Sequence, residues 1–188
     1  MSSLPSAWKK RLISQSDLMT LHETLKEKGK KIVFTAGSWD LLHVGQCRYM
    51  EEAKKQGDVL VVGVSSNSAI RQVKGPNKPI LDEKIRAEML TYLRSVDFVT
   101  ILPEPSCQPS LGLLRPDVFI TVKEDWTDNY KDSKEYKTVT KYGGEVVVVD
   151  RQSTALSTTT IVQRAIGGQL GDIFKEFMEL RKDPLKEK

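Results

Sequence analysis

The sequence is poor in the residues that build metal centres and disulfide frameworks. Its 188 residues include two cysteines and two histidines. Cys47 and Cys107 lie far apart and lack metal-type spacing, which favours a reduced compartment over a disulfide scaffold. We therefore expect a cytoplasmic protein with no metal site of its own.

Long apolar runs and blocks of like charge are also missing. No stretch approaches the roughly 20 apolar residues that span a bilayer, and residues 1–10 lack the apolar core of a signal peptide. The 29 basic and 25 acidic residues give a net charge of +4, without a dense lysine or arginine block. These absences argue against a membrane protein and against nucleic-acid binding.

Three common active-site motifs are absent. The sequence has no G-x-x-x-x-G-K-[ST] phosphate loop, no G-x-G-x-x-G dinucleotide motif and no G-x-S-x-G turn. Their absence argues against a kinase of the phosphate-loop class, a dehydrogenase and an α/β-hydrolase.

Strand and helix patterns alternate from residue 31 onward. The predicted strands are 32–34, 59–64, 98–102, 118–122 and 146–149, and the helices between them are 43–56, 82–94, 109–115 and 131–142. This alternation indicates an α/β fold, a Rossmann-like doubly wound parallel sheet of five strands. In such sheets ligands bind outside the carboxyl ends of the strands, where the strand order reverses.

The ends of the chain extend this core. We expect a helical extension at 1–30, a sheet domain at 31–168, and a C-terminal helix and tail at 169–188. The last helix is expected after Gly167 and Gly168, and its apolar stripe consists of Leu170, Ile173, Phe174, Phe177 and Met178. Such a stripe needs a cover, which predicts a homodimer with this helix at the interface or clamped onto a neighbouring helix of its own subunit.

The segment Thr35–Gln46 joins the first predicted strand to the next helix. Its glycines allow close approach of a ligand to the backbone, and His43 lies at the start of the helix. Free N–H groups at a helix N-terminus favour anions. An imidazole there can stabilise charge on a transferring phosphoryl group, so we assign His43 to catalysis rather than to a structural role.

Three more polar residues are candidates for phosphate contacts. Gln46 lies one helical turn after His43 and can donate an uncharged hydrogen bond, the alternative being a helix-surface glutamine. Lys74 opens the loop 74–79, where a mobile lysine suits a triphosphate and the alternative is a solvated charge. Arg86 is expected to face away from the apolar side of its helix, with a surface charge as the alternative.

Two segments after later strands carry further candidates. Ser157, Thr158 and Thr159 open a helix and form a second anion cradle, or simply cap that helix. The segment 123–126 follows the fourth strand, where Asp125 or the nearby backbone reads a base or ribose, or forms only a turn.

These segments, taken in order from about Arg11 to Ile166, resemble the cytidylyltransferase-like family of nucleotidyltransferases, and within it the heptose-1-phosphate adenylyltransferase domain. The signature is the stretch Lys-Ile-Val-Phe-Thr-x-Gly-x-x-Asp-Leu-Leu-His-Val-Gly at 31–45. The further segments that match are 57–65, 73–76, 86–88, 96–97, 115–118, 142–147 and 156–159.

The resemblance implies that a sugar-phosphate or polyol-phosphate oxygen attacks the α-phosphorus of a nucleoside triphosphate and releases pyrophosphate, with Mg²⁺ bound to the triphosphate. Together with the residues above it assigns catalysis to His43, Lys74 and Gln46, and acceptor binding to Trp39, Asp40 and Lys74. Nucleotide binding falls to Thr35, Ala36, Gly37, His43, Arg86, Lys123, Asp125, Ser157, Thr158 and Thr159.

The sequence departs from the family pattern in three places. Gln46 replaces the second signature histidine, Ser38-Trp39 replaces Cys-Phe or Thr-Phe, and Lys-Glu-Asp-Trp at 123–126 is more similar to glycerol-3-phosphate cytidylyltransferases. The favoured reaction uses ATP and a sugar phosphate such as heptose 1-phosphate, and the alternative uses CTP and glycerol 3-phosphate or a similar polyol phosphate. A third hypothesis, motivated by Gln46, is a degenerate member that binds nucleotide without turnover.

Overall fold

A computed structural model describes residues 7–123, 129–152 and 157–181 of the chain. The chain divides into two compact units, residues 1–153 and residues 154–188. The first unit contains the sheet, and the second contains one long helix. Each unit is described by itself.

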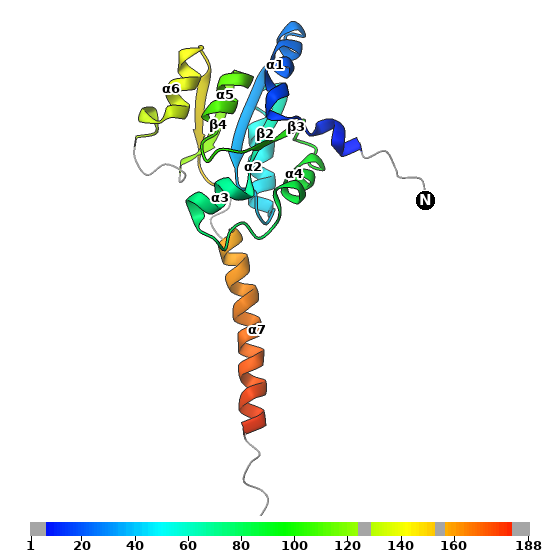
Figure 1. Ribbon diagram of the computed structural model, residues 1–188, viewed down its shortest axis with the longest axis vertical. Coiled ribbons are helices and arrows are strands. Elements are labelled where there is room, and N and C mark those ends of the chain that lie inside the picture. Colours follow the sequence, from blue (N-terminus) through cyan, green and yellow to red (C-terminus); the bar gives the residue numbers. More distant parts are fainter. Residues whose placement is uncertain (1–6, 124–128, 153–156, 182–188) are drawn as a thin grey trace, which may run out of the picture. The chain divides into compact units, whose positions relative to one another are not determined.

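The first unit is built on one sheet of five parallel strands (Figure 1). The strands are β1 (Ile32–Gly37), β2 (Val59–Ser65), β3 (Phe98–Leu102), β4 (Val118–Val122) and β5 (Glu145–Val149). They lie in the order β3-β2-β1-β4-β5, and each neighbouring pair is parallel. The strand order reverses between β1 and β4, so the predicted doubly wound fold is confirmed and the segment after β1 lies at the switch point.

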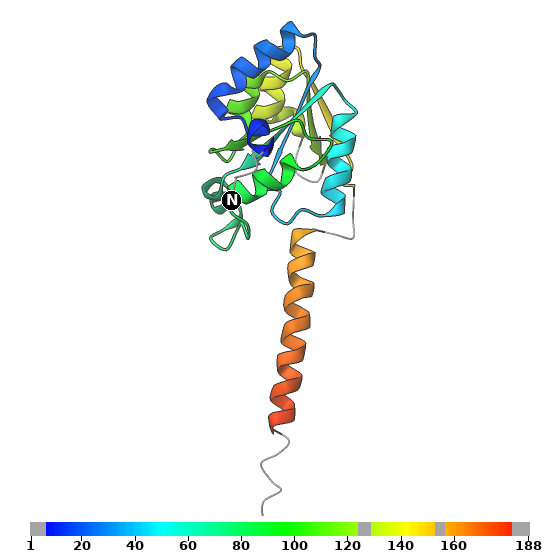
Figure 2. The ribbon, with the colours of Figure 1, turned by 90° about the vertical axis from the view of Figure 1, so that its right-hand side faces the viewer.

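Helices cover both faces of this sheet. They are α1 (Leu18–Glu27), α2 (Val44–Lys54), α3 (Asn67–Lys74), α4 (Glu83–Thr91), α5 (Gln108–Leu114) and α6 (Lys134–Lys141). Short 3-10 helices lie at η1 (Ala7–Arg11), η2 (Gln15–Asp17) and η4 (Tyr130–Asp132). In Figure 2, α1 and α2 lie on opposite sides of the sheet.

Successive residues along the strands point to opposite faces of the sheet, and each face packs into its own hydrophobic core. Val33, Leu60 and Val62 pack with residues of α2 and α4 on one face. Ile32 and Phe34 pack with residues of α1, α5 and α6 on the other. Because both faces of β1 and β2 are buried, the strand sequences are apolar at nearly every position, as is typical of central parallel strands.

The N-terminal segment closes the β3 edge of the sheet. The Ile13 N–H donates to the Val99 carbonyl at 2.8 Å, and Leu12 forms a parallel bridge with Val99. Arg11 Nη1 donates to the Thr91 carbonyl at 2.8 Å, at the end of α4. The described part of the segment 1–30 therefore packs against the sheet in the first unit.

The second unit contains α7 (Thr158–Arg181). This helix continues through Gly167 and Gly168, so the predicted break there is wrong. Each glycine costs about 1 kcal/mol relative to alanine, which weakens a helix without ending it.

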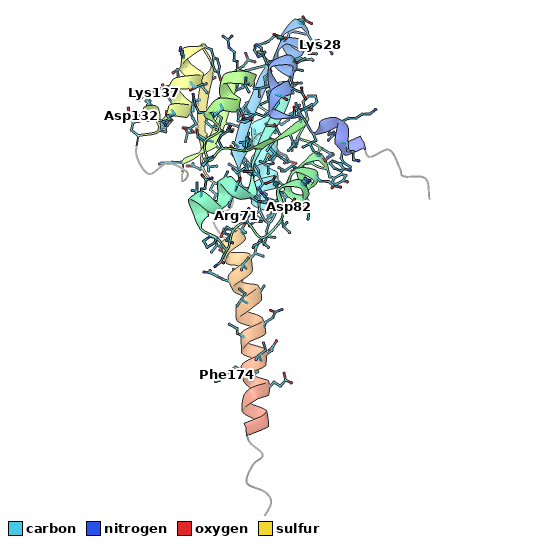
Figure 3. All side chains as sticks on the ribbon, in the orientation of Figure 1. Lys28, Arg71, Asp82, Asp132, Lys137 and Phe174 are labelled. Atoms are coloured by element: carbon cyan, nitrogen blue, oxygen red, sulfur yellow. The ribbon has the colours of Figure 1, made fainter. Side chains whose placement is uncertain are left out.

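The apolar stripe of α7 is open to solvent where it is described. Ile166, Leu170, Ile173 and Phe174 are each at least half exposed, and Phe174 is labelled in Figure 3. The side chains at 177–188 lie outside the described residues, and they include two members of the predicted stripe. Within the described ranges, no helix has both the length and the apolar character needed to cross a membrane.

Candidate functional site

Trp39 fixes the connection between β1 and α2. Its backbone has a positive φ of 46°, and its indole N–H donates to the Gly63 carbonyl of β2 at 2.9 Å. The indole stacks on Tyr49 with ring centres 5.9 Å apart. A Cβ atom on Gly37 would lie 2.9 Å from the Trp39 ring, so this pairing requires glycine at position 37. Trp39 therefore serves the local fold, and its predicted contact with the acceptor stays a prediction.

The Thr35 hydroxyl belongs to a buried hydrogen-bond chain. It lies 2.7 Å from the Tyr49 hydroxyl, which in turn donates to the Ile120 carbonyl at 2.9 Å. This chain engages the Thr35 side chain inside the protein, and the nucleotide contacts of Thr35 and its neighbour Ala36 stay predictions.

Asp40 anchors the segment that leads into α4. Its two carboxylate oxygens accept from the Ile80 N–H at 3.0 and 2.9 Å, and one also accepts from the Leu81 N–H at 2.9 Å. The residue is buried. Asp40 thus holds two parts of the candidate site together, which is a positioning role beside its predicted acceptor contact.

Arg86 is fully buried, with 0% relative exposure. Its guanidinium donates to the Leu81 carbonyl at 2.9 Å, to the Asn67 side-chain carbonyl at 3.0 Å, and to the Ser38 carbonyl. Burial lowers the pKa of Arg86, and the nearby Asp40 opposes this shift. The guanidinium therefore joins α3, α4 and the β1–α2 connection from inside the protein.

The alternative interpretation of Arg86 as a surface charge is wrong. The expectation that Arg86 faces away from the apolar side of its helix is also wrong, since Arg86 is fully buried whereas Ile85 of the same helix is 50% exposed. The guanidinium instead satisfies three carbonyl oxygens, on Ser38, Asn67 and Leu81, from inside the protein. The triphosphate contact predicted for Arg86 stays a prediction.

Gln46 holds the backbone of His43 at the start of α2. Its side-chain Oε1 accepts from the His43 N–H at 3.1 Å, as in the second half of a capping box. The amide oxygen of Gln46 is therefore occupied by the His43 N–H, and the NH₂ group of the same amide is free to donate. Gln46 is therefore more than a surface residue, and its predicted phosphate contact remains available through that NH₂ group.

The His43 side chain lies beside the Gln46 backbone N–H in the same capping-box arrangement, without a hydrogen bond to it among the described residues. Its Nδ1 atom is buried and finds no hydrogen-bond partner among the described residues. Burial lowers the pKa of His43, and the positive charge of Arg151 lowers it further. The imidazole is therefore neutral near pH 7 and has one N–H to donate.

Lys74 reaches the same connection from α3. Its ammonium donates to the Ser38 hydroxyl at 2.8 Å. α3 ends there because Gly75 adopts a positive φ of 90°. The structure therefore brings Lys74 to the predicted turn, as both were expected at the carboxyl edge of the sheet.

Two further cations follow neighbouring strands. Lys123 comes directly after β4 and is exposed. Arg151 comes two residues after the end of β5 and acts on His43 through its charge. Sequence reasoning missed Arg151, although a basic residue just beyond a predicted parallel strand was the available signal. Lys74, Lys123 and Arg151 thus place three cations at the carboxyl edge of the sheet, which suits a polyanion.

Other predicted site residues stand apart from this group. Asp125 lies outside the described residues. Ser157 belongs to the second unit, where its Oγ accepts from the Thr160 N–H at 3.1 Å and caps α7. The capping interpretation of Ser157 is therefore confirmed, while the anion contacts of Ser157, Thr158 and Thr159 stay predictions.

Known proteins resemble this chain over most of its length. Two relatives named "Bifunctional protein HldE" come from Syntrophotalea carbinolica and Geobacter metallireducens. The first is 36% identical over 152 residues, 81% of this chain and 30% of the relative. The second is 39% identical over 144 residues, 77% of this chain and 29% of the relative. The chain thus spans less than a third of the length of these relatives.

A solved structure supports the same placement. The lipopolysaccharide core biosynthesis protein from Thermoplasma volcanium is 28% identical, with a TM-score of 0.54 over 65% of this chain and 97% of that protein. Residues 34–164, from β1 to α7, match the family described as cytidylyltransferase-like. The chain belongs to the cytidylyltransferase-like family of nucleotidyltransferases.

Proposed function

We propose that this chain transfers the nucleoside monophosphate of a nucleoside triphosphate, with ATP favoured, to a sugar phosphate such as heptose 1-phosphate. The observation that carries the proposal is the position of His43 at the N-terminus of α2, at the switch point of the sheet, with an Nδ1 atom that has no hydrogen-bond partner among the described residues. The similarity to a protein named for lipopolysaccharide core biosynthesis supports a sugar-based acceptor.

The proposed chemistry is a single in-line displacement. A phosphate oxygen of the acceptor attacks the α-phosphorus, the new P–O bond forms, and the bond to the β-phosphate oxygen breaks to release pyrophosphate. His43 donates its N–H to an α-phosphate oxygen as charge develops there. Lys74 and Arg151 supply positive charge for the departing phosphates. Catalysis is then positioning and charge stabilisation, without a covalent enzyme intermediate.

Mg²⁺ is proposed to arrive as part of the substrate, on the triphosphate. Among the described residues, no three His, Cys, Asp or Glu side chains form a group that could hold a metal ion. The Asp40 carboxylate already accepts from two backbone N–H groups. Mg²⁺ keeps several waters and is commonly held by substrate phosphates, where it neutralises charge.

A pyrophosphate-release screen tests this function. ATP, CTP, GTP and UTP are each combined with heptose 1-phosphate, glucose 1-phosphate and glycerol 3-phosphate, in the presence of Mg²⁺. We expect turnover with ATP and a sugar 1-phosphate. Turnover with CTP and glycerol 3-phosphate would instead establish the cytidylyltransferase alternative, whose basis is the Lys-Glu-Asp-Trp segment. Nucleotide binding without turnover across the panel would establish the degenerate binder.

Gln46→His is expected to raise kcat about tenfold. As a neutral imidazole the new side chain accepts from the His43 N–H at one ring nitrogen and donates from the other to phosphate; when protonated it gives up the bond to His43 and offers a charged N–H to phosphate. Hydrogen bonds to charged groups contribute about 1.5–3 kcal/mol, and imperfect placement reduces that gain.

Gln46→Ala is the matched control, measured by steady-state kinetics and thermal unfolding. It removes the hydrogen bond to His43 and is expected to cost about 1 kcal/mol of stability and to lower kcat. A Gln46→His variant that is slower than the wild type would contradict this prediction and would show that the amide group itself is needed.

A homodimer is proposed from the apolar stripe of α7. Ile166, Leu170, Ile173 and Phe174 follow helical spacing and are at least half exposed, and a second copy is the commonest cover for such a surface. We expect light scattering to give the mass of a dimer for the full chain. Truncation after Gly168 is expected to yield a monomer with a lower Tm.

Two results would contradict the homodimer proposal. A monomeric full-length chain would exclude the dimer. A truncated chain that stays dimeric and equally stable would exclude a role of the helix in assembly.

A further inference from the structure

Ser38 lies in the connection between β1 and α2, and two of its polar groups engage cations. Its hydroxyl lies 2.8 Å from the Lys74 ammonium, and its carbonyl oxygen accepts from the Arg86 guanidinium. Arg86 is fully buried, whereas Lys74 is exposed as the last residue of α3. Ser38 therefore joins a buried cation that builds the connection to an exposed cation of the candidate site.

The backbone that carries the Ser38 hydroxyl is held without help from Lys74. The Ser38 carbonyl is bound by Arg86, and Trp39 is tied to β2 through its indole N–H. The Asp40 carboxylate accepts from two backbone N–H groups of the segment before α4. Each of three successive residues is thus tied to another element, so the Ser38 hydroxyl is a fixed point beside the lysine.

The Lys74 side chain, by contrast, has few constraints of its own. Among the described residues, the Ser38 hydroxyl is the one hydrogen-bond partner of its ammonium, and no carboxylate pairs with it. A lysine side chain has many rotamers, so a contact that selects one of them lowers the entropic cost of using its charge. An ammonium only donates, and a neutral hydroxyl that accepts from it leaves its positive charge uncompensated.

We propose that Ser38 is a positioning residue for Lys74, whose ammonium it holds at the β1–α2 connection for the triphosphate. This inference rests on the proposed function, in which Lys74 supplies charge to the departing phosphates. A neutral acceptor suits the task, because a carboxylate at position 38 would hold the ammonium but cancel its charge. Ser38 acts through Lys74 and not on the reacting atoms.

Ser38→Ala removes the hydroxyl and keeps the backbone links of the connection. It is expected to raise the KM for the triphosphate and to lower kcat/KM about tenfold, the order of effect of a hydrogen bond to a charged group. The Tm should stay near the wild-type value, because the lost bond lies at the surface. Ser38→Thr keeps a hydroxyl and is expected to restore kcat/KM.

Lys74→Met, made in the wild type and in Ser38→Ala, shows whether Ser38 acts through the lysine. Lys74→Met alone is expected to lower kcat/KM more than Ser38→Ala does, and the double variant should be no slower than Lys74→Met. Ser68→Ala is the matched control, since it removes an exposed hydroxyl from the helix that carries Lys74, and it should change neither kcat nor KM.

Three results of these kinetics would overturn the proposal. The first is a wild-type kcat/KM in Ser38→Ala. The second is an equal fold-loss from Ser38→Ala with and without Lys74, which would show that the two residues act independently. The third is a Ser38→Thr variant as slow as Ser38→Ala, which would show that the hydroxyl is not the group that matters.

Calorimetric titration of the same proteins with ATP and with CTP, each with Mg²⁺, separates this proposal from the transfer function. Binding without turnover would exclude the transfer function, while a coupled loss of affinity in the Ser38 and Lys74 variants would still support positioning. Turnover with independent losses would exclude positioning and leave the transfer function in place. Binding of neither nucleotide would overturn both.

Discussion

Replacement of His43 by alanine is expected to lower kcat by roughly 10²–10³-fold, with little change in Tm. The imidazole is the donor placed at the start of α2, and the loss of one transition-state donor has an effect of this size. The fold should tolerate the change because His43 Nδ1 makes no hydrogen bond within the described structure. The bond from the His43 N–H to Gln46 uses the backbone and survives the substitution.

The control for this variant is Val44→Ala in the same helical turn. Val44 is 46% exposed and has no polar side-chain group, so its truncation should leave kcat and KM near the wild-type values. Pyrophosphate release and thermal unfolding are measured on both variants. If His43→Ala turned over at the wild-type rate, the reacting phosphate would have to lie elsewhere, and the assignment of this site would be wrong.

The sheet could be predicted because its strands are buried on both faces. β3 and β4 were predicted over the same residues that the structure shows, and the other three differ by a few residues at their ends. A run such as Val59–Val64 is apolar throughout, and in a chain where strand and helix patterns alternate it is best explained as a buried strand. No single segment determines the order of the strands. The alternation of strands and helices along the chain nevertheless favours the doubly wound arrangement.

α3 was missed because its sequence signal is weak. It has eight residues, of which Ala69 and Ile70 are buried. A short helix of this kind lacks the repeated apolar spacing that reveals longer ones. The one local sign was Ser66, whose hydroxyl accepts from the Ala69 N–H at 3.1 Å. This helix contributes to the candidate site because its last residue is Lys74.

The candidate site was predictable where function depends on a local motif. His43 at a helix start and Lys74 at the carboxyl edge follow from the order of elements, and the hydrogen bond from Lys74 to Ser38 places them at one connection. The internal roles of Trp39, Asp40 and Gln46 were not predictable, because their partners lie on distant segments or are backbone groups. No periodicity in one helix reveals which carbonyl oxygens another segment leaves without donors.

Arg86 is the clearest case of such a hidden role, and Arg86→Met is expected to lower the free energy of unfolding by about 3–5 kcal/mol. Methionine fills similar space but leaves three acceptors, on Ser38, Asn67 and Leu81, without their donor. Arg86→Lys should recover only part of this loss, since an ammonium cannot match the planar fork that reaches all three. Urea unfolding measures both variants.

The same variant should also lower kcat, because Arg86 positions the connection that carries Ser38 and His43. Lys84→Met provides the matched control: it removes an exposed cation from the same helix and should change stability by less than about 0.5 kcal/mol. Equal stability of Arg86→Met and Lys84→Met would contradict the structural role. Loss of activity in a stable Arg86→Lys variant, with KM for the triphosphate raised, would instead support the direct phosphate contact that the sequence predicts. Comparing the loss of stability with the loss of activity therefore shows whether Arg86 only positions the site or also contacts the triphosphate.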